Sequence, residues 1–268
     1  MFVHESAEIH HTAVVEDGAV IGQNCKIGAF SVVGPNVILG ENVELKSHAV
    51  VEGWTKIGDG TIIFPFASIG HIPQDLKFGG ERTKLEIGKR NRIREHVTMN
   101  PGTEGGGGLT RIGDDGLFMM SSHIGHDCIV GNEVVLANNA SLGGHCIIED
   151  NVTMGALSGV HQFCRVGQGA MVGGLAAVAA DVIPYSTVMG NRASLEGLNL
   201  IGLKRRGYKK DEINGLRAAF KVLFANAGIL RERAEIIQLE YRSNALVQSV
   251  TAFILKNSDR HITTPKEG

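Results

Sequence analysis

The sequence predicts a mainly β protein in two parts, a parallel β-helix over residues 1–190 and a small α-helical domain over residues 191–268. Three observations predict this fold. An aliphatic residue recurs at every sixth position, glycine accounts for 36 of 268 residues, and the spacing of six is lost beyond residue 190. Abundant glycine without a collagen repeat indicates many tight corners, because glycine adopts backbone conformations that other residues avoid.

The repeat of six residues runs unbroken through its first eleven units. Its aliphatic positions are Ile9, Val15, Ile21, Ile27, Val33, Leu39, Leu45, Val51, Ile57, Ile63 and Ile69. The position two residues earlier is small or β-branched, as at Ala19 and Cys25. A heptad would predict a coiled coil and strict alternation an ordinary sheet, whereas this hexad is typical of a parallel β-helix. Three hexads form one triangular coil of 18 residues with the aliphatic side chains inside.

Two loops interrupt the repeat, at residues 71–84 and 100–111. Gln74, Asp75 and Lys77 give the first the chemistry of a binding loop, and four consecutive glycines predict that the second is a mobile flap. The repeat resumes at Ile112 and is expected to end near Pro184, because proline lacks an N–H for the next strand pairing. The 26 hexads predict about nine coils, or a prism about 40 Å long.

Three amphipathic helices are expected after the β-helix, in KKDEINGLRAAFKVLFANAG, RERAEIIQLEY and NALVQSVTAFILKN. In the first, Ile213, Leu216 and Phe220 fall on one face. The simplest role for these helices is to cap the open end of the solenoid.

The charge and hydropathy pattern excludes some classes of function. A net charge of -2 and a pI of about 6.6 argue against general nucleic-acid affinity and against a basic membrane-binding surface. No apolar run is long enough to span a bilayer, and the N-terminus lacks the pattern of a signal peptide. A cytosolic protein without membrane insertion is expected.

Four histidines lie within residues 117–163, at His123, His126, His145 and His161. Residues 18 apart stack on successive coils, so the period predicts two neighbouring columns: His126, Gly144 and Gln162, then Asp127, His145 and Phe163. Such a cluster has the parts of an acyl-transfer site. A neutral histidine can deprotonate an attacking hydroxyl, a carboxylate can orient it, and a glycine N–H can stabilise the oxyanion, without a serine or cysteine nucleophile.

Other interpretations compete with acyl transfer. A surface histidine usually has no catalytic role, and three histidines from neighbouring coils could instead bind zinc. A structural or peptide-binding β-helix is the non-catalytic alternative. Cys128, Cys146 and Cys164 are also spaced by 18, but like Cys25 they occupy the small position of the hexad, which predicts buried packing thiols. Lys204, Arg205 and Arg206 follow the coils, where guanidinium groups could hold a pyrophosphate.

The segments IPQDLKF, RNRIREHVT, SSHIGHDCIVGN, LANNASLGGH, GVHQFCRVG, MVGG and GLKRRG, in this order, closely resemble the UDP-N-acetylglucosamine O-acyltransferase family of lipid A (lipopolysaccharide) biosynthesis. The resemblance covers nearly the whole chain. It implies left-handed coils, a cytoplasmic homotrimer with sites between neighbouring subunits, and no metal or cofactor. It also implies transfer of an (R)-3-hydroxyacyl group to the 3-hydroxyl of UDP-N-acetylglucosamine. The donor would be the 4′-phosphopantetheine thioester of acyl carrier protein.

The resemblance also assigns roles to individual residues. His126 would be the general base, Asp127 its polar neighbour, and the N–H of Gly144 the oxyanion donor. The residues implied to bind the sugar nucleotide are Asp75, Lys77, His123, His145, His161, Gln162, Asn199, Arg205 and Arg206. Gly174 and Arg192 match the positions that set acyl-chain length. Arg192 stands where histidine is expected, so the length stays open.

Three other enzyme activities remain as alternatives to O-acyl transfer. Some relatives acylate a 3-amino sugar, so O- and N-acylation are not separated. The later N-acyltransferase of the pathway carries an extra N-terminal uridine-binding domain, whereas here the hexads begin almost at once. A γ-class carbonic anhydrase-like metalloenzyme is the third alternative. The chain departs from the family at Asn100-Pro101, where histidine-arginine is common, and at Ile201, where an acidic residue is common.

Overall fold

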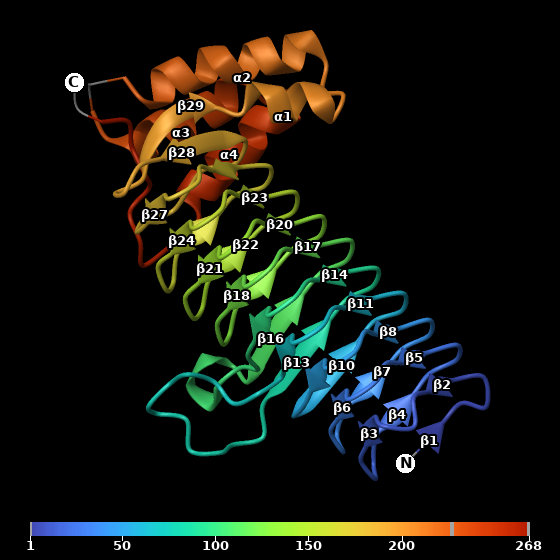
Figure 1. The fold of residues 1–268 in the computed structure, drawn as a ribbon. Helices are drawn as coiled ribbons and strands as arrows, with labels where there is room; N and C mark the ends of the chain where they lie inside the picture. Colours follow the sequence, from blue (N-terminus) through green and yellow to red (C-terminus); the bar gives the residue numbers. More distant parts are fainter. Residues whose placement is uncertain (1, 226–227, 267–268) are drawn as a thin grey trace.

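The computed structural model describes residues 2–225 and 228–266, which form a left-handed parallel β-helix with helices at its C-terminal end (Figure 1). Sheet A contains β1 (Phe2–Val3), β4 (Val20–Ile21), β7 (Ile38–Leu39), β10 (Trp54–Ile57), β13 (Lys84–Ile87), β16 (Leu109–Ile112), β19 (Ile129–Val130), β22 (Ile147–Ile148) and β25 (Arg165–Val166). Each coil contributes one short strand to each of three sheets.

The other two faces of the prism are sheets B and C. Sheet B contains β2 (Glu8–Ile9), β5 (Lys26–Ile27), β8 (Glu44–Leu45), β11 (Ile62–Ile63), β14 (Arg92–Ile93), β17 (Leu117–Phe118), β20 (Val135–Leu136), β23 (Thr153–Met154), β26 (Met171–Val172), β28 (Ser186–Met189) and β29 (Ser194–Leu198). Sheet C contains β3 (Val14–Val15), β6 (Val32–Val33), β9 (Val50–Val51), β12 (Ser68–Ile69), β15 (Thr98–Met99), β18 (His123–Ile124), β21 (Ser141–Leu142), β24 (Gly159–Val160) and β27 (Ala177–Val178).

The strand pairing confirms the period of 18. His123 pairs with Ser141 and Ser141 with Gly159, while Thr98 pairs with His123 across the second loop. The aliphatic position of each hexad points inward, and from Ile21 onward these side chains are buried. The small position is also buried, with Cys25, Cys128, Cys146 and Cys164 all free and inside the prism. The cysteines are therefore packing residues, as predicted.

The ends of the solenoid differ from the prediction. Strand pairing starts one hexad earlier, because Val3 already pairs with Ile21. It also continues beyond Pro184. Val182 bridges to Val166 before the proline and Thr187 pairs with Met171 after it, so Pro184 falls in a turn where no N–H is needed. β29 then pairs antiparallel with β28, beyond the expected boundary at residue 190.

Among the described residues, four helices follow: α1 (Leu200–Arg205), α2 (Lys210–Leu223), α3 (Leu230–Glu240) and α4 (Ala245–Leu255). The last three match the predicted amphipathic segments, and α1 was not predicted. Figure 1 shows them at the C-terminal end of the solenoid beyond β27, gathered around β28 and β29. The guanidinium carbon of Arg165 on the last coils lies 4.3 Å from the ring centroid of Phe253 in α4, and its Nε is 2.8 Å from the buried Asp181 carboxylate. Over the described residues, no helix has the length and apolar character needed to cross a membrane.

Candidate active site

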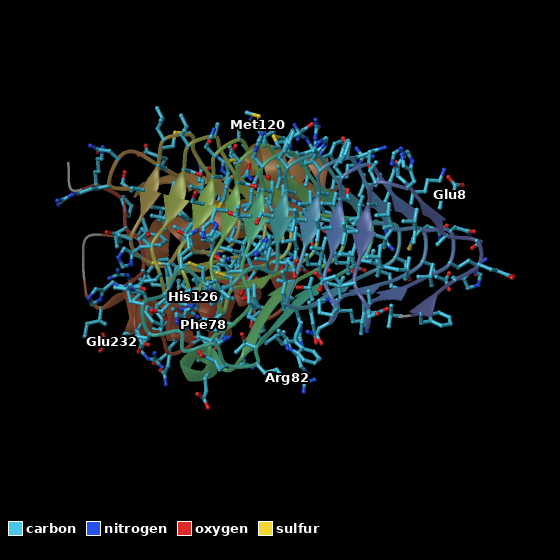
Figure 2. The ribbon with its side chains drawn as sticks, turned by 60° about the horizontal axis from the view of Figure 1, so that its bottom comes forward. Glu8, Phe78, Arg82, Met120, His126 and Glu232 are labelled. Atoms are coloured by element: carbon cyan, nitrogen blue, oxygen red, sulfur yellow. The ribbon has the colours of Figure 1, made fainter. Side chains whose placement is uncertain are left out.

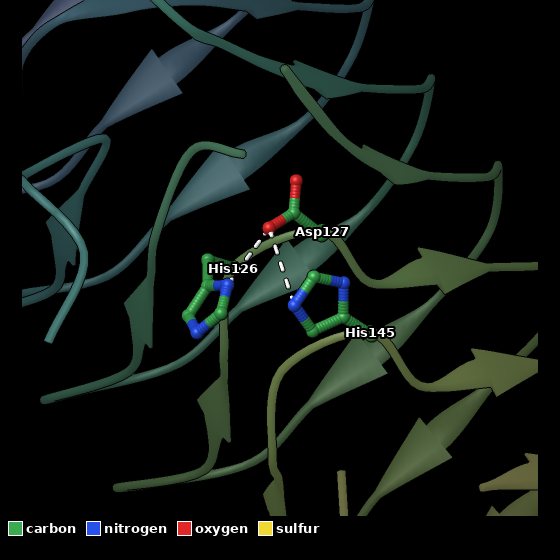
Figure 3. Close-up of side chains that lie close together, drawn as sticks. All are labelled: His126, Asp127 and His145. Carbon is green, nitrogen blue, oxygen red and sulfur yellow. Dashed lines mark hydrogen bonds and ion pairs between the residues drawn. The ribbon is translucent and has the colours of Figure 1, made fainter. Parts of the chain in front are cut away.

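Three polar side chains converge on the edge where sheet C turns into sheet A (Figure 3). His126 and Asp127 form the turn between β18 and β19, and His145 occupies the same turn one coil later. Nδ1 of His126 lies 2.8 Å from Oδ2 of Asp127, and Nε2 of His145 lies 3.8 Å from the same oxygen. The Asp127 side chain is 1% exposed, whereas those of His126 and His145 are 16% and 23% exposed. A buried carboxylate therefore faces two accessible imidazoles.

The second loop holds the Asp127 carboxylate in place. The Thr103 N–H donates to Oδ1 at 2.8 Å, and the Thr103 hydroxyl donates to Oδ2 at 2.7 Å. The Asp127 N–H donates to the Thr110 hydroxyl at 2.7 Å. The loop is also close-packed, since a Cβ on Gly106 would lie 2.0 Å from Cγ of Asp127. Residues 100–108 thus pack on the site. These contacts with Asp127 were not expected of a mobile flap.

The contact with Asp127 fixes the tautomer of His126. A carboxylate accepts hydrogen bonds, so Nδ1 of His126 carries the proton and Nε2 is left as the basic nitrogen. Gly144 lies close to Nε2 of His126: a Cβ added to Gly144 would be only 2.6 Å from this nitrogen. The sequence predicted this column from the period alone.

The backbone beside Gly144 leaves one donor free. The Gly143 N–H donates to Val160 O and the His145 N–H to His126 O, whereas within the described chain the Gly144 N–H has no backbone acceptor. An unpaired N–H next to a basic imidazole nitrogen is the arrangement that stabilises an oxyanion during acyl transfer.

Two further contacts shape the electrostatics. Nδ1 of His123 lies 2.7 Å from the Thr98 hydroxyl, and burial, with a smaller contribution from His126, lowers the pKa of His123. Burial also lowers the pKa of His145, and the nearby Asp127 partly opposes that shift. His145 stacks on Phe163 with ring centroids 4.4 Å apart. The neutral imidazole form is therefore favoured for both His123 and His145.

A groove of about 550 Å³ runs from this cluster along sheet C. It is lined by Gln74, Asn100, His123, Gly125, His126, Ser141, Leu142, Gly143, Gly144, Gly159, Val160, His161, Gln162, Ala177, Val178 and Ala179. The outward side chains along its floor are small at Ser141, Gly159 and Ala177. This shape leaves room for an elongated ligand.

A second cavity of about 510 Å³ opens on the other side of His145. It is lined by Asp75, Lys77, Gly79, Glu81, Thr103, Glu104, Gly105, His145 and Phe163. The first loop, expected at residues 71–84, spans residues 70–83 between β12 and β13, and it carries Asp75 and Lys77 to the histidine edge. In Figure 2, Phe78 of this loop lies on the same side of the solenoid as His126.

The remaining predicted residues lie on other edges of the chain. At the turn between sheets A and B, Nη2 of Arg206 donates to Asn151 O at 2.7 Å, and Arg205 ends helix α1 nearby. The Asn199 side chain accepts from the Gly202 N–H and donates to Gly169 O, so it caps α1 and ties it to the coil.

The two residues expected to set acyl-chain length lie near sheet C's last strand. Gly174 is in the turn before β27, and Arg192 is in the β28–β29 turn, which is hydrogen-bonded to Ala177 through Gly190 O and the Ala193 N–H. Both residues are exposed.

Sequence reasoning missed two residues at the site. Thr103 belongs to the inserted loop, so its place over Asp127 does not follow from the period. Arg260 belongs to the C-terminal tail, and its Nη2 lies 3.0 Å from Nδ1 of His161 and 2.9 Å from Gln162 O. No sequence pattern links residues 99 positions apart in this way.

His126, Asp127 and His145 also each offer one potential metal-ligand atom, all within 4.8 Å of one another. The zinc interpretation therefore has a specific candidate site. Zinc there would compete with the hydrogen bond between Nδ1 of His126 and Asp127.

Comparison with known proteins assigns the family. An acyl-[acyl-carrier-protein]–UDP-N-acetylglucosamine O-acyltransferase of Paracoccus denitrificans is 58% identical over 204 residues, which are 76% of this chain and 77% of the relative. The chain belongs to the UDP-N-acetylglucosamine O-acyltransferase family. A Rhizobium leguminosarum enzyme of the same name is 51% identical over 225 residues, covering 84% of this chain and 83% of that one.

Family models and solved structures agree with this assignment. Residues 181–263 match the second domain of UDP-N-acetylglucosamine O-acyltransferases, and residues 2–35 and 18–53 match bacterial transferase hexapeptide repeats. The UDP-N-acetylglucosamine acyltransferase from Campylobacter jejuni superposes with a TM-score of 0.91 at 41% identity, over 97% of this chain and 100% of that chain. The predicted left-handed β-helix and the predicted membership of this acyltransferase family are confirmed.

Proposed function

We propose that this protein transfers an (R)-3-hydroxyacyl chain from acyl carrier protein to the 3-hydroxyl of UDP-N-acetylglucosamine, the first step of lipid A biosynthesis. One observation supports it above the others: Nδ1 of His126 contacts the Asp127 carboxylate, and Nε2 faces Gly144, whose N–H has no backbone acceptor within the described chain. The proposed substrates are those in the names of the relatives that are 58% and 51% identical to this chain. We also propose that the reaction needs no metal or other cofactor.

The reaction follows from these groups. Nε2 of His126 removes the proton from the sugar hydroxyl while the oxygen attacks the thioester carbonyl, and a C–O bond forms. The Gly144 N–H stabilises the resulting oxyanion, and Asp127 stabilises the imidazolium. The tetrahedral intermediate then collapses with cleavage of the C–S bond. His126 returns its proton to the phosphopantetheine sulfur, which leaves the ester and a free thiol.

We propose a cytoplasmic homotrimer. Asn199, Arg205 and Arg206 lie on the edge between sheets A and B, whereas the histidines lie on the edge between sheets C and A. One chain therefore presents two parts of the expected site on different edges, and a neighbouring copy can bring them together. Light scattering measures the mass of the assembly and so tests whether it is a trimer. Mixed assemblies of inactive His126→Ala and Arg206→Ala chains should regain part of the activity if the site is shared, and none if each chain works alone.

The test of the reaction is mass-resolved product formation with UDP-N-acetylglucosamine and a panel of (R)-3-hydroxyacyl carrier proteins after exhaustive chelation. Ester product that survives chelation supports direct acyl transfer, and the preferred chain reports the space near Gly174 and Arg192. Product only with a 3-amino sugar nucleotide would replace the O-acyl proposal. Activity that is lost on chelation and restored by zinc would favour the metal site at His126, Asp127 and His145.

The test of the mechanism is His126→Ala. Removal of the general base should lower turnover by about 10²- to 10⁴-fold while binding of UDP-N-acetylglucosamine and the unfolding temperature stay near those of the wild type. Near-wild-type turnover would remove His126 from the mechanism.

A further inference from the structure

The C-terminal tail returns from α4 to the last coil of the solenoid and is fixed there by backbone hydrogen bonds. The Asp181 N–H donates to His261 O at 2.8 Å, and the Thr263 N–H donates to Asp181 O at 2.7 Å. Asp181 itself is fully buried and paired with Arg165. The tail is therefore docked by a parallel bridge between Asp181 and Ile262, and Arg260 lies two residues before Ile262.

The guanidinium of Arg260 is placed against the turn that follows β24. Its Nη2 lies 3.0 Å from Nδ1 of His161 and 2.9 Å from Gln162 O. His161 and Gln162 both line the groove that contains His126. Among the described residues no carboxylate pairs with Arg260, and its Nε is buried without an acceptor. The position of the charge is thus set by the docked tail and by this turn.

The contact determines which nitrogen of His161 carries the proton. Arginine only donates hydrogen bonds, and Nη2 has two N–H groups, one for Nδ1 of His161 and one for Gln162 O. Nδ1 also lies 3.2 Å from Gln162 O, but it cannot donate to that oxygen while it accepts from Arg260. The two shorter contacts to Nη2 leave Nδ1 unprotonated. The proton of the neutral ring is then on Nε2, which becomes a hydrogen-bond donor.

We propose that Arg260 is a positioning residue that holds His161 in its Nε2–H form, so that His161 donates to an acceptor oxygen of the sugar nucleotide in the groove. This inference rests on the proposed acyl transfer and adds a residue from the C-terminal tail to its site. Arg260 acts through His161, so replacing either residue removes the same interaction.

The test compares Arg260→Met, which keeps the length of the apolar stem but removes the donors, with Arg260→Lys and with the exposed tail control His261→Ala. Arg260→Met should raise KM for UDP-N-acetylglucosamine about tenfold, as expected for one lost hydrogen bond to substrate, with little change in kcat. Arg260→Lys should restore part of the affinity, and His261→Ala should match the wild type. In a His161→Ala background, Arg260→Met should have no further effect.

Two measurements separate positioning from tail docking. Two-bond ¹H–¹⁵N correlation spectra of histidine-labelled protein report the tautomer of His161, which should lose its Nε2–H preference in Arg260→Met. The unfolding temperature reports tail docking and should stay unchanged. Additive effects in the double variant, an unchanged KM or an unchanged tautomer would overturn the proposal. If the wild type fails to acylate the sugar nucleotide, the proposed function falls, while the tautomer spectrum still decides whether Arg260 controls His161.

Discussion

Gly144→Ala tests the geometry of the site with one added methyl group. The new Cβ would lie 2.6 Å from Cε1 and Nε2 of His126, whereas ordinary contacts begin at 3.4 Å. The ring and the methyl group must therefore separate by about 0.8 Å, the difference between these two distances. Since Gly144 does not have a positive φ, alanine fits the backbone there, and the clash with the ring is the main effect.

The expected cost follows from that displacement. A reacting group misplaced by about 1 Å slows an enzyme by about 100-fold, or about 2.7 kcal/mol in the activation free energy. Gly144→Ala should thus reduce kcat for acyl transfer by about two orders of magnitude. The assay is product formation from acyl carrier protein thioester, with the unfolding temperature measured in parallel.

Ser47 supplies the matched control. It follows Leu45 by two residues as Gly144 follows Leu142, but it lies on an early coil away from His126, Asp127 and His145. Ser47→Ala should leave kcat unchanged. If Gly144→Ala is folded and retains kcat within about threefold of the wild type, the close packing of Gly144 on His126 does not matter for the reaction, and the reasoning is refuted.

Three further predictions concern the surroundings of the site. Thr103→Val removes the hydroxyl donor to Asp127 and should slow transfer about tenfold or more, measured as kcat. Arg165→Met leaves the Asp181 charge buried and unpaired and should lower the free energy of unfolding by about 3–5 kcal/mol in a denaturant titration. The pKa of His123 is lowered in the folded state, so the unfolded state binds a proton more readily as pH falls. The free energy of unfolding should therefore decrease below about pH 6.5, and His123→Asn should reduce that dependence.

Each of these predictions has a result that contradicts it. An unchanged kcat in Thr103→Val would mean that the Thr103 N–H alone positions Asp127. The control for Arg165→Met is Arg231→Met, because Arg231 forms an exposed ion pair with Glu235. Arg231→Met should lower the free energy of unfolding by at most about 0.5 kcal/mol. An equal loss in the two arginine variants would count against a special role for the buried pair. A pH dependence that His123→Asn leaves intact would have to come from other groups.

The regular part of the site was predictable because the coil has a fixed period. Once hexads are recognised, the stacking of Gly144 on His126 and of Phe163 on His145 follows from counting 18 residues. The inside of the prism was predictable for the same reason, since each aliphatic position is buried by its neighbours above and below.

The inserted and terminal segments were not predictable because their contacts are not periodic. Thr103 reaches Asp127 across 24 residues, a separation set by the shape of one loop. Arg260 reaches His161 only because the tail beyond α4 pairs with Asp181. Helix α1 was not predicted because its six residues are too few to show a helical hydrophobic period.

Backbone strain does not distinguish the site from the rest of the solenoid. Asp127 and His145 have left-handed φ values of +60° and +61°, which cost free energy in any residue but glycine. Taken alone, these values would suggest strain stored for function. Residues on early coils, such as Phe30 and His48, have φ of +59° in the same kind of turn. The coil therefore imposes this conformation on its corners generally. What makes one corner a candidate active site is the chemistry added to it: a buried carboxylate in the turn, donors to that carboxylate from a loop, and the imidazoles of His126 and His145 beside it.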